Sequence, residues 1–239
     1  MRTIDVCLSP ALFQAYSKDN QIVVIIDAVR ACASICVAFI NGAEAVIPVS
    51  EIDEALKYRE QNCLLAGERD SFKVEGFDFG NSPYEFENPI IKGKNIVFST
   101  TNGTQAVNQF LTSGFSNCEL IIGSFLNISS VCNYLLNQDK DILILCSGWK
   151  NAVNIEDTLF AGILARKLSE KQNFIYSEAT NIASEFSKLS GENYIDFVKS
   201  MSPRLKSKED LLENDFIYCF KTDITNLVPI LNNNKFIVR

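Results

Sequence analysis

"NIVFSTTNGTQAV", residues 95–107, contains three kinds of sequence in immediate succession. It begins with an apolar run of strand length, passes through small polar residues, and continues with residues that are compatible with a helix. A helix that starts directly after a buried strand offers free backbone N–H groups there, because its first turn has no intrahelical acceptors. The stretch therefore predicts a strand, a polar turn and a helix start.

The same succession recurs along most of the chain. Four more apolar runs are each followed by a helix-patterned segment: "QIVVIID" by "RACASICVAFIN", "AEAVIPV" by "EIDEALKYREQ", "LIIGS" by "ISSVCNYLLN", and "DILILC" by "IEDTLFAGILARKL". Such alternation implies crossover connections and a largely parallel or mixed sheet with helices on both faces. The predicted fold class is therefore α/β.

The chain is expected to form a single domain over residues 1–239. Its 239 residues with 47% apolar composition suffice for one substantial core, and neither a linker nor an internal repeat divides the sequence. From about residue 170 onward the pattern becomes more polar and more helical. Two late strands are predicted after that, at "DFIYCF" (215–220) and "KFIVR" (235–239).

The net charge and the composition of the chain limit the kinds of ligand and the cellular location that we expect. The net charge of −7 opposes binding to nucleic acid or to an anionic membrane, so a small anionic ligand would need a local basic pocket. The N-terminal segment lacks the apolar run of a signal peptide or a spanning helix, and the eight cysteines resemble reduced core thiols. A cytoplasmic location is expected, and a homo-oligomer stays open.

The chain contains no histidine. This excludes Ser-His-Asp and Cys-His activation of a nucleophile, phosphohistidine chemistry and every His-ligated metal site. Chemistry must then depend on carboxylates, Arg, Lys, hydroxyls, thiols, backbone amides or an oxygen-liganded metal.

The polar turn after the first quoted strand is a candidate oxyanion site. Its members share short polar side chains or, for the glycine, a backbone that a ligand can approach: Ser99, Thr100, Thr101, Asn102, Gly103 and Thr104. In open α/β sheets, ligands bind beyond the carboxyl ends of strands at such helix starts. A polar turn that only caps a helix is the alternative.

A second cluster pairs a carboxylate with a guanidinium. Asp27 ends one predicted strand and Arg30 lies in the following first helical turn, so the two could bind a metal and an anion. A structural Asp–Arg pair is the alternative. Val29 breaks the pattern of two Asp residues separated by one, so an aspartyl-phosphate on Asp27 is not indicated.

The long segment "LLAGERDSFKVEGFDFGNSPYEF", residues 64–86, is the least regular part of the chain. It carries Glu68, Arg69, Asp78 and Asn81, and loops of this length in compact domains are usually functional or disordered. Cys63 and Arg69 also match the C-x5-R spacing of cysteine phosphatases. That match is weak, because Leu64 and Leu65 favour a strand and Glu68 would repel an anion.

The segment "CSGWKNAVNIEDTLFAG", residues 146–162, adds Glu156 and Asp157 in a first helical turn. Helix capping explains either carboxylate equally well. Together, however, the four clusters contain the groups that magnesium-dependent phosphoryl transfer requires without histidine. Carboxylates suit a hard cation, arginines and oriented amides suit phosphate, and a further carboxylate can orient water.

The ordered motifs resemble the 2-phosphosulfolactate phosphatase (ComB) family. The similarity covers residues 20–168 and "DFIYCFKTDITNLVPIL" near the C-terminus, and it includes "IIDAVRACASI", "FSTTNGTQAV", "GSFLNISSV" and "LCSGWKNAVNIEDTLFAG". The resemblance implies an α/β phosphatase that requires Mg²⁺ and hydrolyses (R)-2-phospho-3-sulfolactate to 3-sulfolactate and phosphate, a step in coenzyme M biosynthesis.

The resemblance also implies which residues form the site. The expected catalytic residues are Asp27, Glu68 and Asp157. The expected metal ligands are Asp27, Glu68, Asp78, Glu156 and Asp157. The expected substrate-binding residues are Arg30, Arg69, Asn81, Thr100, Thr101, Asn102, Gly103 and Thr104. We assign phosphate to Arg30 and the carboxylate or sulfonate to Arg69.

Two departures from the family pattern bear on the substrate. Cys32 stands where the family has a hydroxyl residue after Asp27, and Trp149 with Lys150 stands where a glycine-rich segment is expected. Two alternatives therefore stay open: a phosphatase for another small anionic phosphate ester, and a non-catalytic module that binds an anionic metabolite. The acidic clusters favour catalysis, because an anion binder gains nothing from several carboxylates beside its ligand.

Overall fold

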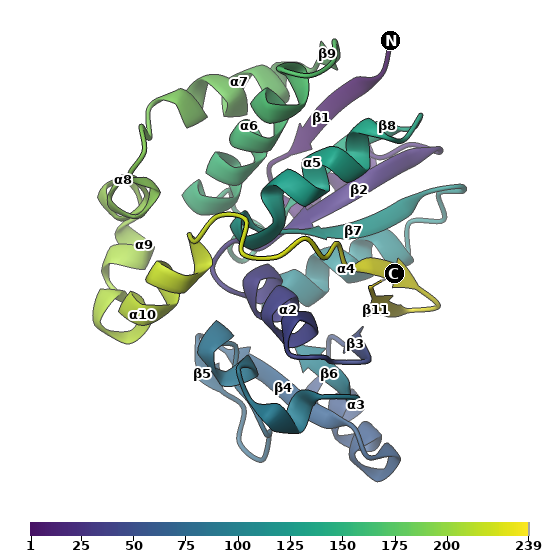
Figure 1. Ribbon diagram of the computed structural model, residues 1–239, viewed down its shortest axis with the longest axis vertical. Helices are drawn as coiled ribbons and strands as arrows, with labels where there is room; N and C mark the ends of the chain where they lie inside the picture. The colour runs from purple at the N-terminus through teal and green to yellow at the C-terminus, as the bar shows by residue number, and fades with distance from the viewer. Residues whose placement is uncertain (239) are drawn as a thin grey trace.

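The computed structural model describes residues 1–238, which form an eleven-stranded mixed sheet with helices on both faces (Figure 1). The strand order is β5-β4-β6-β3-β11-β10-β7-β2-β8-β1-β9. All five predicted strand–helix successions form as expected. The prediction of an α/β fold is confirmed, and the sheet is of the mixed kind.

Five neighbouring strands form the first parallel block. In spatial order they are β7 (Glu119–Gly123), β2 (Gln21–Ile26), β8 (Asp141–Cys146), β1 (Thr3–Cys7) and β9 (Ile175–Tyr176). Every residue of β2 is buried, because helices cover both faces of this block. That burial explains the uninterrupted apolar run in the sequence.

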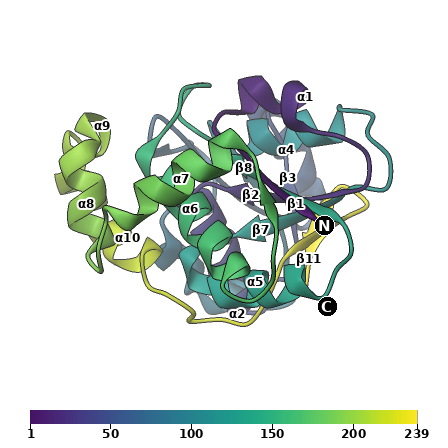
Figure 2. The same ribbon diagram turned by 90° about the horizontal axis from the view of Figure 1, so that it is seen from above.

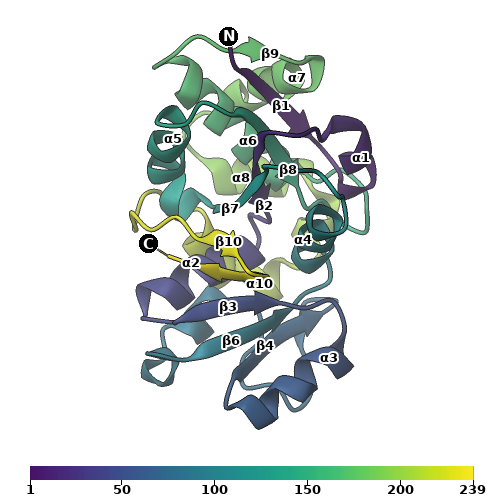
Figure 3. The same ribbon diagram turned by 90° about the vertical axis from the view of Figure 1, so that its right-hand side faces the viewer.

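A second, smaller parallel block is joined to the first by the C-terminal hairpin. Its strands are β3 (Ala45–Pro48), β6 (Asn95–Ser99) and β4 (Leu64–Arg69), with the short β5 (Phe72–Lys73) antiparallel to β4. The hairpin of β10 (Ile230–Asn232) and β11 (Lys235–Ile237) lies between β7 and β3 (Figure 3). Three successive antiparallel pairings separate the blocks, so their strands run in opposite senses.

Helix α2 (Ala31–Ile40) lies between the two blocks (Figure 1). It contacts β7 of the first block and the short helix Pro83–Phe86, which connects β5 to β6 of the second. Its sequence "ACASICVAFI" is apolar on all sides, and all its residues except Ile40 are buried. A helix without a polar face belongs inside a core, which is where α2 lies.

The remaining helices of the main body cover the two faces of the first block. Helices α1 (Phe13–Tyr16) and α4 (Gly103–Leu111) lie on one face, and α5 (Ile128–Leu136) lies on the other (Figures 2 and 3). Helix α6 (Ile155–Ser169) packs beside α5, while α3 (Ile52–Lys57) belongs to the smaller block. No helix within residues 1–238 has both the length and the apolar character to cross a membrane.

The segment 178–219 is largely helical and lies to the left of the sheet in Figure 1. It contains α7 (Glu178–Lys188), α8 (Tyr194–Met201), α9 (Pro203–Lys206) and α10 (Glu209–Cys219). We call residues 194–219, which hold the last three of these helices, the C-terminal arm. Helix α7 packs closely on α6 at Gly162, which has no side chain. A Cβ at this position would lie only 2.0 Å from the carbonyl oxygen of Ala183.

One of the two predicted late strands was wrong. Residues 215–220 belong to α10 and its C-cap rather than to a strand, because Leu212, Phe216 and Cys219 recur at helical spacing and bury one face. The other late strand is confirmed as β11 within "KFIVR", of which Arg239 lies outside the described residues.

Candidate active site

Four buried carboxylates gather where the two blocks of the sheet meet. Asp27 follows β2, Glu68 lies near the end of β4, and Glu156 and Asp157 occupy the first turn of α6. Their residue exposures are between 0 and 8%. The charges of Glu68 and Glu156 both act on Asp27, and that of Asp27 acts on Asp157. Tertiary structure therefore brings together carboxylates from three of the sequence motifs.

Burial makes three of these carboxylates, Asp27, Glu156 and Asp157, reluctant to ionise. Desolvation, followed by the nearby charge of Glu68, raises the pKa of Asp27 to about 7. Burial also raises the pKa of Glu156, although Arg204 opposes that effect, and it raises the pKa of Asp157 well above its ordinary value. A cluster of this kind favours either protons or a bound cation.

Asp157 is held by hydrogen bonds to the surrounding backbone. Its Oδ1 accepts from the N–H of Ala28 at 2.8 Å, and its Oδ2 accepts from the N–H of Gly148 at 3.0 Å and from Nδ2 of Asn154 at 3.0 Å. These bonds join the ends of β2 and β8 to α6. Both oxygens therefore already have donors, and a catalytic or metal-binding role for Asp157 stays a prediction.

Glu68 positions the polar turn after β6. Its Oε1 accepts from the N–H of Thr101 at 2.8 Å, and its Oε2 accepts from the N–H of Ser71 at 2.7 Å. The start of α4 then approaches Asp27 so closely that a Cβ at Gly103 would lie 3.2 Å from Asp27 Oδ2. Glycine leaves room for this close approach, so the turn and the carboxylate belong to one site.

The other residues of the turn keep its shape. Thr100 Oγ1 accepts from the N–H of Thr104, while the Thr104 hydroxyl donates to the carbonyl of Thr100 at 2.5 Å. The side chain of Asn102 accepts from the N–H of Lys150 at 3.0 Å. Within residues 1–238, the backbone N–H groups of Asn102 and Gly103 make no hydrogen bond to protein. They are therefore available to an anion at the start of α4.

Buried polar atoms without a partner concentrate around this site. Among the residues described, four of the six such atoms belong to the candidate motifs or directly follow β8: Asn81 Oδ1, Thr101 Oγ1, Ser147 Oγ and Glu156 Oε2. Buried polar groups are normally hydrogen-bonded, so a concentration of exceptions indicates a place that a ligand completes. Sequence reasoning missed Ser147, although it follows β8 as Asp27 follows β2.

Arg30 is anchored by the C-terminal arm. Its Nη1 lies 2.6 Å from Asp215 Oδ2 in a buried ion pair, and its Nη2 donates to the carbonyl of Ser71 at 3.1 Å. Asp215 also accepts from the hydroxyl of Ser82 at 2.5 Å. Sequence reasoning missed Asp215, whose signal was an acidic residue on the apolar face of a helix.

Arg69 and Asp78 make their contacts with the protein itself. Arg69 gives four hydrogen bonds to oxygens of Glu68, Ser50 and Ser99, which leaves one of its five N–H donors for a substrate. Asp78 accepts from the N–H of Leu65 and pairs with Arg59 at 3.4 Å. The structure does not bring Asp78 to the other carboxylates, and the predicted roles of both residues stay predictions.

The thiol of Cys32 makes its contacts with the backbone of β2 and of Asp27. Its thiol accepts from the N–H of Asp27 at 3.1 Å and lies 3.6 Å from the carbonyl oxygen of Ile25. Burial raises the pKa of this thiol well above its ordinary value. Cys32 therefore fixes the backbone at the strand end that carries Asp27.

The arm adds basic side chains that sequence reasoning missed. Arg204, from α9, donates through Nη2 to Glu156 Oε1, and its charge also acts on Asp27. Lys208 precedes α10 and donates to Ser71 Oγ at 2.6 Å. Both lie in a polar, helical stretch whose charges were indistinguishable from those of a solvated surface.

The oxygen atoms of the carboxylate cluster are chemically suitable ligands for a magnesium ion. Carboxylate oxygens are the ligands that Mg²⁺ prefers, and Glu156 Oε2 is buried without a partner. Asp27 Oδ2 likewise makes no hydrogen bond within residues 1–238, since the N–H of Ala31 donates to Oδ1. No three acidic or thiol side chains within residues 1–238 form a preassembled metal-ligand set, so Asp27 and Glu156 would need water or substrate oxygens to complete one.

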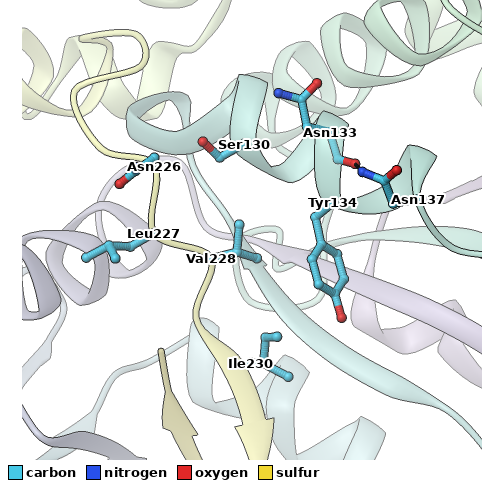
Figure 4. A pocket seen from close by; sticks show the side chains of 8 residues that line it. All are labelled: Ser130, Asn133, Tyr134, Asn137, Asn226, Leu227, Val228 and Ile230. Carbon is cyan, nitrogen blue, oxygen red and sulfur yellow. Dashed lines mark hydrogen bonds between the residues drawn. The ribbon is translucent and has the colours of Figure 1, made fainter. Parts of the chain in front are cut away.

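A separate surface hollow lies between α5 and residues 226–230 (Figure 4). Its lining has no Lys, Arg, Asp or Glu and consists of Ser130, Asn133, Tyr134, Asn137, Asn226, Leu227, Val228 and Ile230. A phosphate ester would find neither a cation nor a metal ligand there. The carboxylate cluster is therefore the better candidate for phosphate chemistry.

Cys63 is expected to be dispensable. It lies at the amino end of β4, buried among apolar side chains, and burial raises the pKa of its thiol. A strand rises about 3.3 Å per residue, so six residues of β4 separate Cys63 from Arg69 by about 20 Å instead of closing a phosphate loop. Cys63→Ser should keep at least about half of the activity measured for the wild type. Complete inactivation of a folded variant would restore the cysteine-phosphatase interpretation.

Comparisons with known proteins agree on one family. A sequence profile described as 2-phosphosulpholactate phosphatase matches residues 7–234. A probable 2-phosphosulfolactate phosphatase of Thermotoga petrophila is 39% identical over 217 residues, which is 90% of this chain and 91% of the relative. Proteins with the same description are 38% identical in Caldanaerobacter subterraneus subsp. tengcongensis (88% of each chain) and 35% identical in Clostridium perfringens strain 13 (97% of this chain, 94% of the relative).

Proposed function

Because the chain belongs to the 2-phosphosulfolactate phosphatase family, whose members hydrolyse phosphoric monoesters, we propose that it converts (R)-2-phospho-3-sulfolactate to 3-sulfolactate and phosphate with Mg²⁺. This is the step that the family would contribute to coenzyme M biosynthesis. The observation that carries the proposal is the buried carboxylate cluster, with the unpaired Glu156 Oε2, beside the free amides at the start of α4.

The phosphate would lie between that helix start and Arg30. The N–H groups of Asn102 and Gly103 offer two donors in the partial positive field of α4, and Thr101 adds an unpaired hydroxyl. Arg30 adds a guanidinium whose orientation is set by Asp215 and Ser71. These groups can hold three phosphoryl oxygens in a fixed orientation.

The carboxylates Asp27 and Glu156 would hold Mg²⁺, which neutralises charge on the phosphoryl oxygens when bound. Phosphoryl transfer passes through a loose transition state, so positioning and charge stabilisation matter more than covalent chemistry by the protein. Water adds to phosphorus while the bond from phosphorus to the ester oxygen breaks. The leaving sulfolactate oxygen takes the electron pair and gains a proton from that water. Asp27 is the residue that orients the water.

The site also argues against a purely non-catalytic anion binder. Glu68, Glu156 and Asp27 would each repel an anionic metabolite unless a cation lies between them and the ligand. A phosphatase for another small anionic phosphate ester stays the main alternative, because the same site would serve it.

A comparison of three substrates tests the proposed function. Phosphate release is measured with Mg²⁺ from 2-phosphosulfolactate, phospholactate and an aryl phosphate. One additional desolvated charged contact corresponds to roughly tenfold or more in affinity, so kcat/KM should be highest for 2-phosphosulfolactate by at least about tenfold. Equal efficiencies would leave a broader magnesium phosphatase, and no release from any of the three would favour the non-catalytic module.

A further inference from the structure

Three cationic side chains surround the only tryptophan of the chain. Lys208 Nζ and Arg204 Cζ each lie 4.8 Å from the ring centroid of Trp149, and Lys150 Nζ lies 5.5 Å from it. Trp149 and Lys150 follow β8, whereas the other two come from the C-terminal arm. An aromatic face attracts a cation, and here one ring collects three.

Within residues 1–238, two of the three cations in this cluster are paired with carboxylates, and Lys208 is not. Arg204 pairs with Glu156, and Lys150 makes an exposed pair with Asp70 at 3.1 Å. In the part of the chain that the structure describes, Lys208 makes no ion pair and donates only to Ser71 Oγ and, at 3.3 Å, to the carbonyl of Asp70. Burial and the neighbouring charge of Arg204 both lower the pKa of Lys208, and an added anion would relieve the second effect.

The cluster adjoins the proposed phosphate site through Ser71. The N–H of Ser71 donates to Glu68, its carbonyl accepts from Arg30, and its hydroxyl accepts from Lys208. A ligand whose phosphate contacts Arg30 can therefore extend a second charged group toward Lys208. Arg69 is a poorer candidate for that contact, because only its Nε–H donor is uncommitted.

We propose that Lys208 and Arg204, held over Trp149, form a subsite for the second anionic group of the substrate, either a sulfonate or a carboxylate. The inference rests on the proposed function and transfers to Lys208 the role first assigned to Arg69. Trp149 orders the two flexible side chains before the ligand arrives, which lowers the entropic cost of binding. With this subsite, the enzyme would bind small phosphate esters that carry a second anionic group more tightly than those that do not.

The single tryptophan allows a direct binding test. Tryptophan emission is followed while 3-sulfolactate is added to the Mg²⁺-containing protein. The wild type should give a saturable change, and Lys208→Met should raise the Kd about ten- to a hundredfold, since a charge-assisted hydrogen bond is lost. The matched control is Lys206→Met, an exposed lysine of α9 whose loss should change the Kd less than about twofold. An unchanged Kd in Lys208→Met overturns the subsite.

Kinetics separate the two possible anionic groups. In Lys208→Met, kcat/KM for 2-phosphosulfolactate should fall about ten- to a hundredfold, chiefly through KM, with a much smaller loss for an aryl phosphate. An equal loss for phospholactate assigns the contact to the carboxylate, and a small loss for phospholactate assigns it to the sulfonate. Equal losses for all three substrates overturn the subsite. A wild type that binds 3-sulfolactate in a Lys208-dependent manner but hydrolyses nothing would refute the proposed function and leave the subsite standing.

Discussion

Replacing Asp27 with Asn is expected to reduce kcat by at least about a hundredfold and, at the same time, to make the metal-free protein more stable at pH 8. The loss of activity follows because the carboxylate that we propose to orient water and hold the cation is removed, while the shape of the side chain is kept. The gain in stability follows from the electrostatics of the empty site. If Asp27 had a purely structural role, its replacement would not lower kcat and raise stability at pH 8 together.

The sign of the stability effect comes from the pKa of Asp27. Burial and Glu68 raise its pKa to about 7 in the folded protein, whereas an Asp in an unfolded chain has a pKa of about 3.9. Between these values the folded state keeps a proton that the unfolded state has lost, so stability falls as pH rises from about 4 to 7. Asn cannot ionise and avoids this penalty.

The size of the stability penalty at pH 8 follows from the same shift in the pKa of Asp27. At about 1.36 kcal/mol per pKa unit, the penalty at pH 8 is roughly 2–4 kcal/mol, which corresponds to about 4–16 °C in Tm for a domain of this size. Thermal unfolding of the metal-free proteins at pH 4 and pH 8 measures it, and the difference between variant and wild type should nearly vanish at pH 4. Asp139→Asn, at an exposed position, is the matched control and should change neither Tm nor kcat appreciably. If Asp27→Asn turns over within a few-fold of wild type, Asp27 is structural and Glu68 or Asp157 becomes the leading catalytic carboxylate.

Removal of divalent cations is expected to abolish turnover, and Mg²⁺ is expected to restore it. The chain has no histidine and offers oxygen ligands at the site, so a hard cation is the electrophile that its residues can hold. Activity after EDTA treatment, and after Mg²⁺ is added back in excess, measures the dependence. Undiminished turnover in the thoroughly chelated enzyme would exclude the metal mechanism.

Thermal unfolding tests the predicted Mg²⁺ binding without an activity assay. Mg²⁺ at a hundred times its Kd should stabilise the folded protein by about 2.7 kcal/mol, or about 5–11 °C in Tm. Glu156→Gln should reduce that stabilisation, since Glu156 Oε2 is a buried oxygen without a protein partner. The same shift in Glu156→Gln as in the wild type would place the ion elsewhere.

Local sequence was sufficient to predict most of the regular structure. The apolar runs at 21–26, 95–99 and 141–146 became strands, and "ACASICVAFI" became a helix buried on all sides, because periodicity and burial are properties of a short segment. The same reasoning failed at 215–220, where aromatic and apolar residues favoured a strand but helical spacing decided the outcome. Aromatic content is compatible with either structure once a segment packs on a core.

Some features of the candidate site were likewise predicted from the sequence, and others were not. Asp27, Glu156 and the "STTNGT" turn were predicted because each follows a strand or opens a helix within its own motif. Glu68 was predicted as part of an irregular segment, whereas the structure places it in β4. The bonds of Arg69 to three backbone carbonyls and the separation of Asp78 from the other carboxylates could not be predicted, because both depend on how β4 lies against its neighbours.

By itself, the sequence determined the α/β class, the positions of the strand–turn–helix units and the oxygen-only chemistry that the absence of histidine imposes. Only the tertiary structure decided that two opposed parallel blocks meet through the C-terminal hairpin. It also decided that Arg204 of the arm contacts Glu156, that Lys208 contacts Ser71, and that Asp215 pairs with Arg30, 185 residues earlier in the chain. The physical reason is that periodicity records only whether a residue faces a core. Which charged groups share that site depends on non-local strand pairing and helix packing, and a polar residue in a helix has the same local pattern whether it faces solvent or a buried carboxylate.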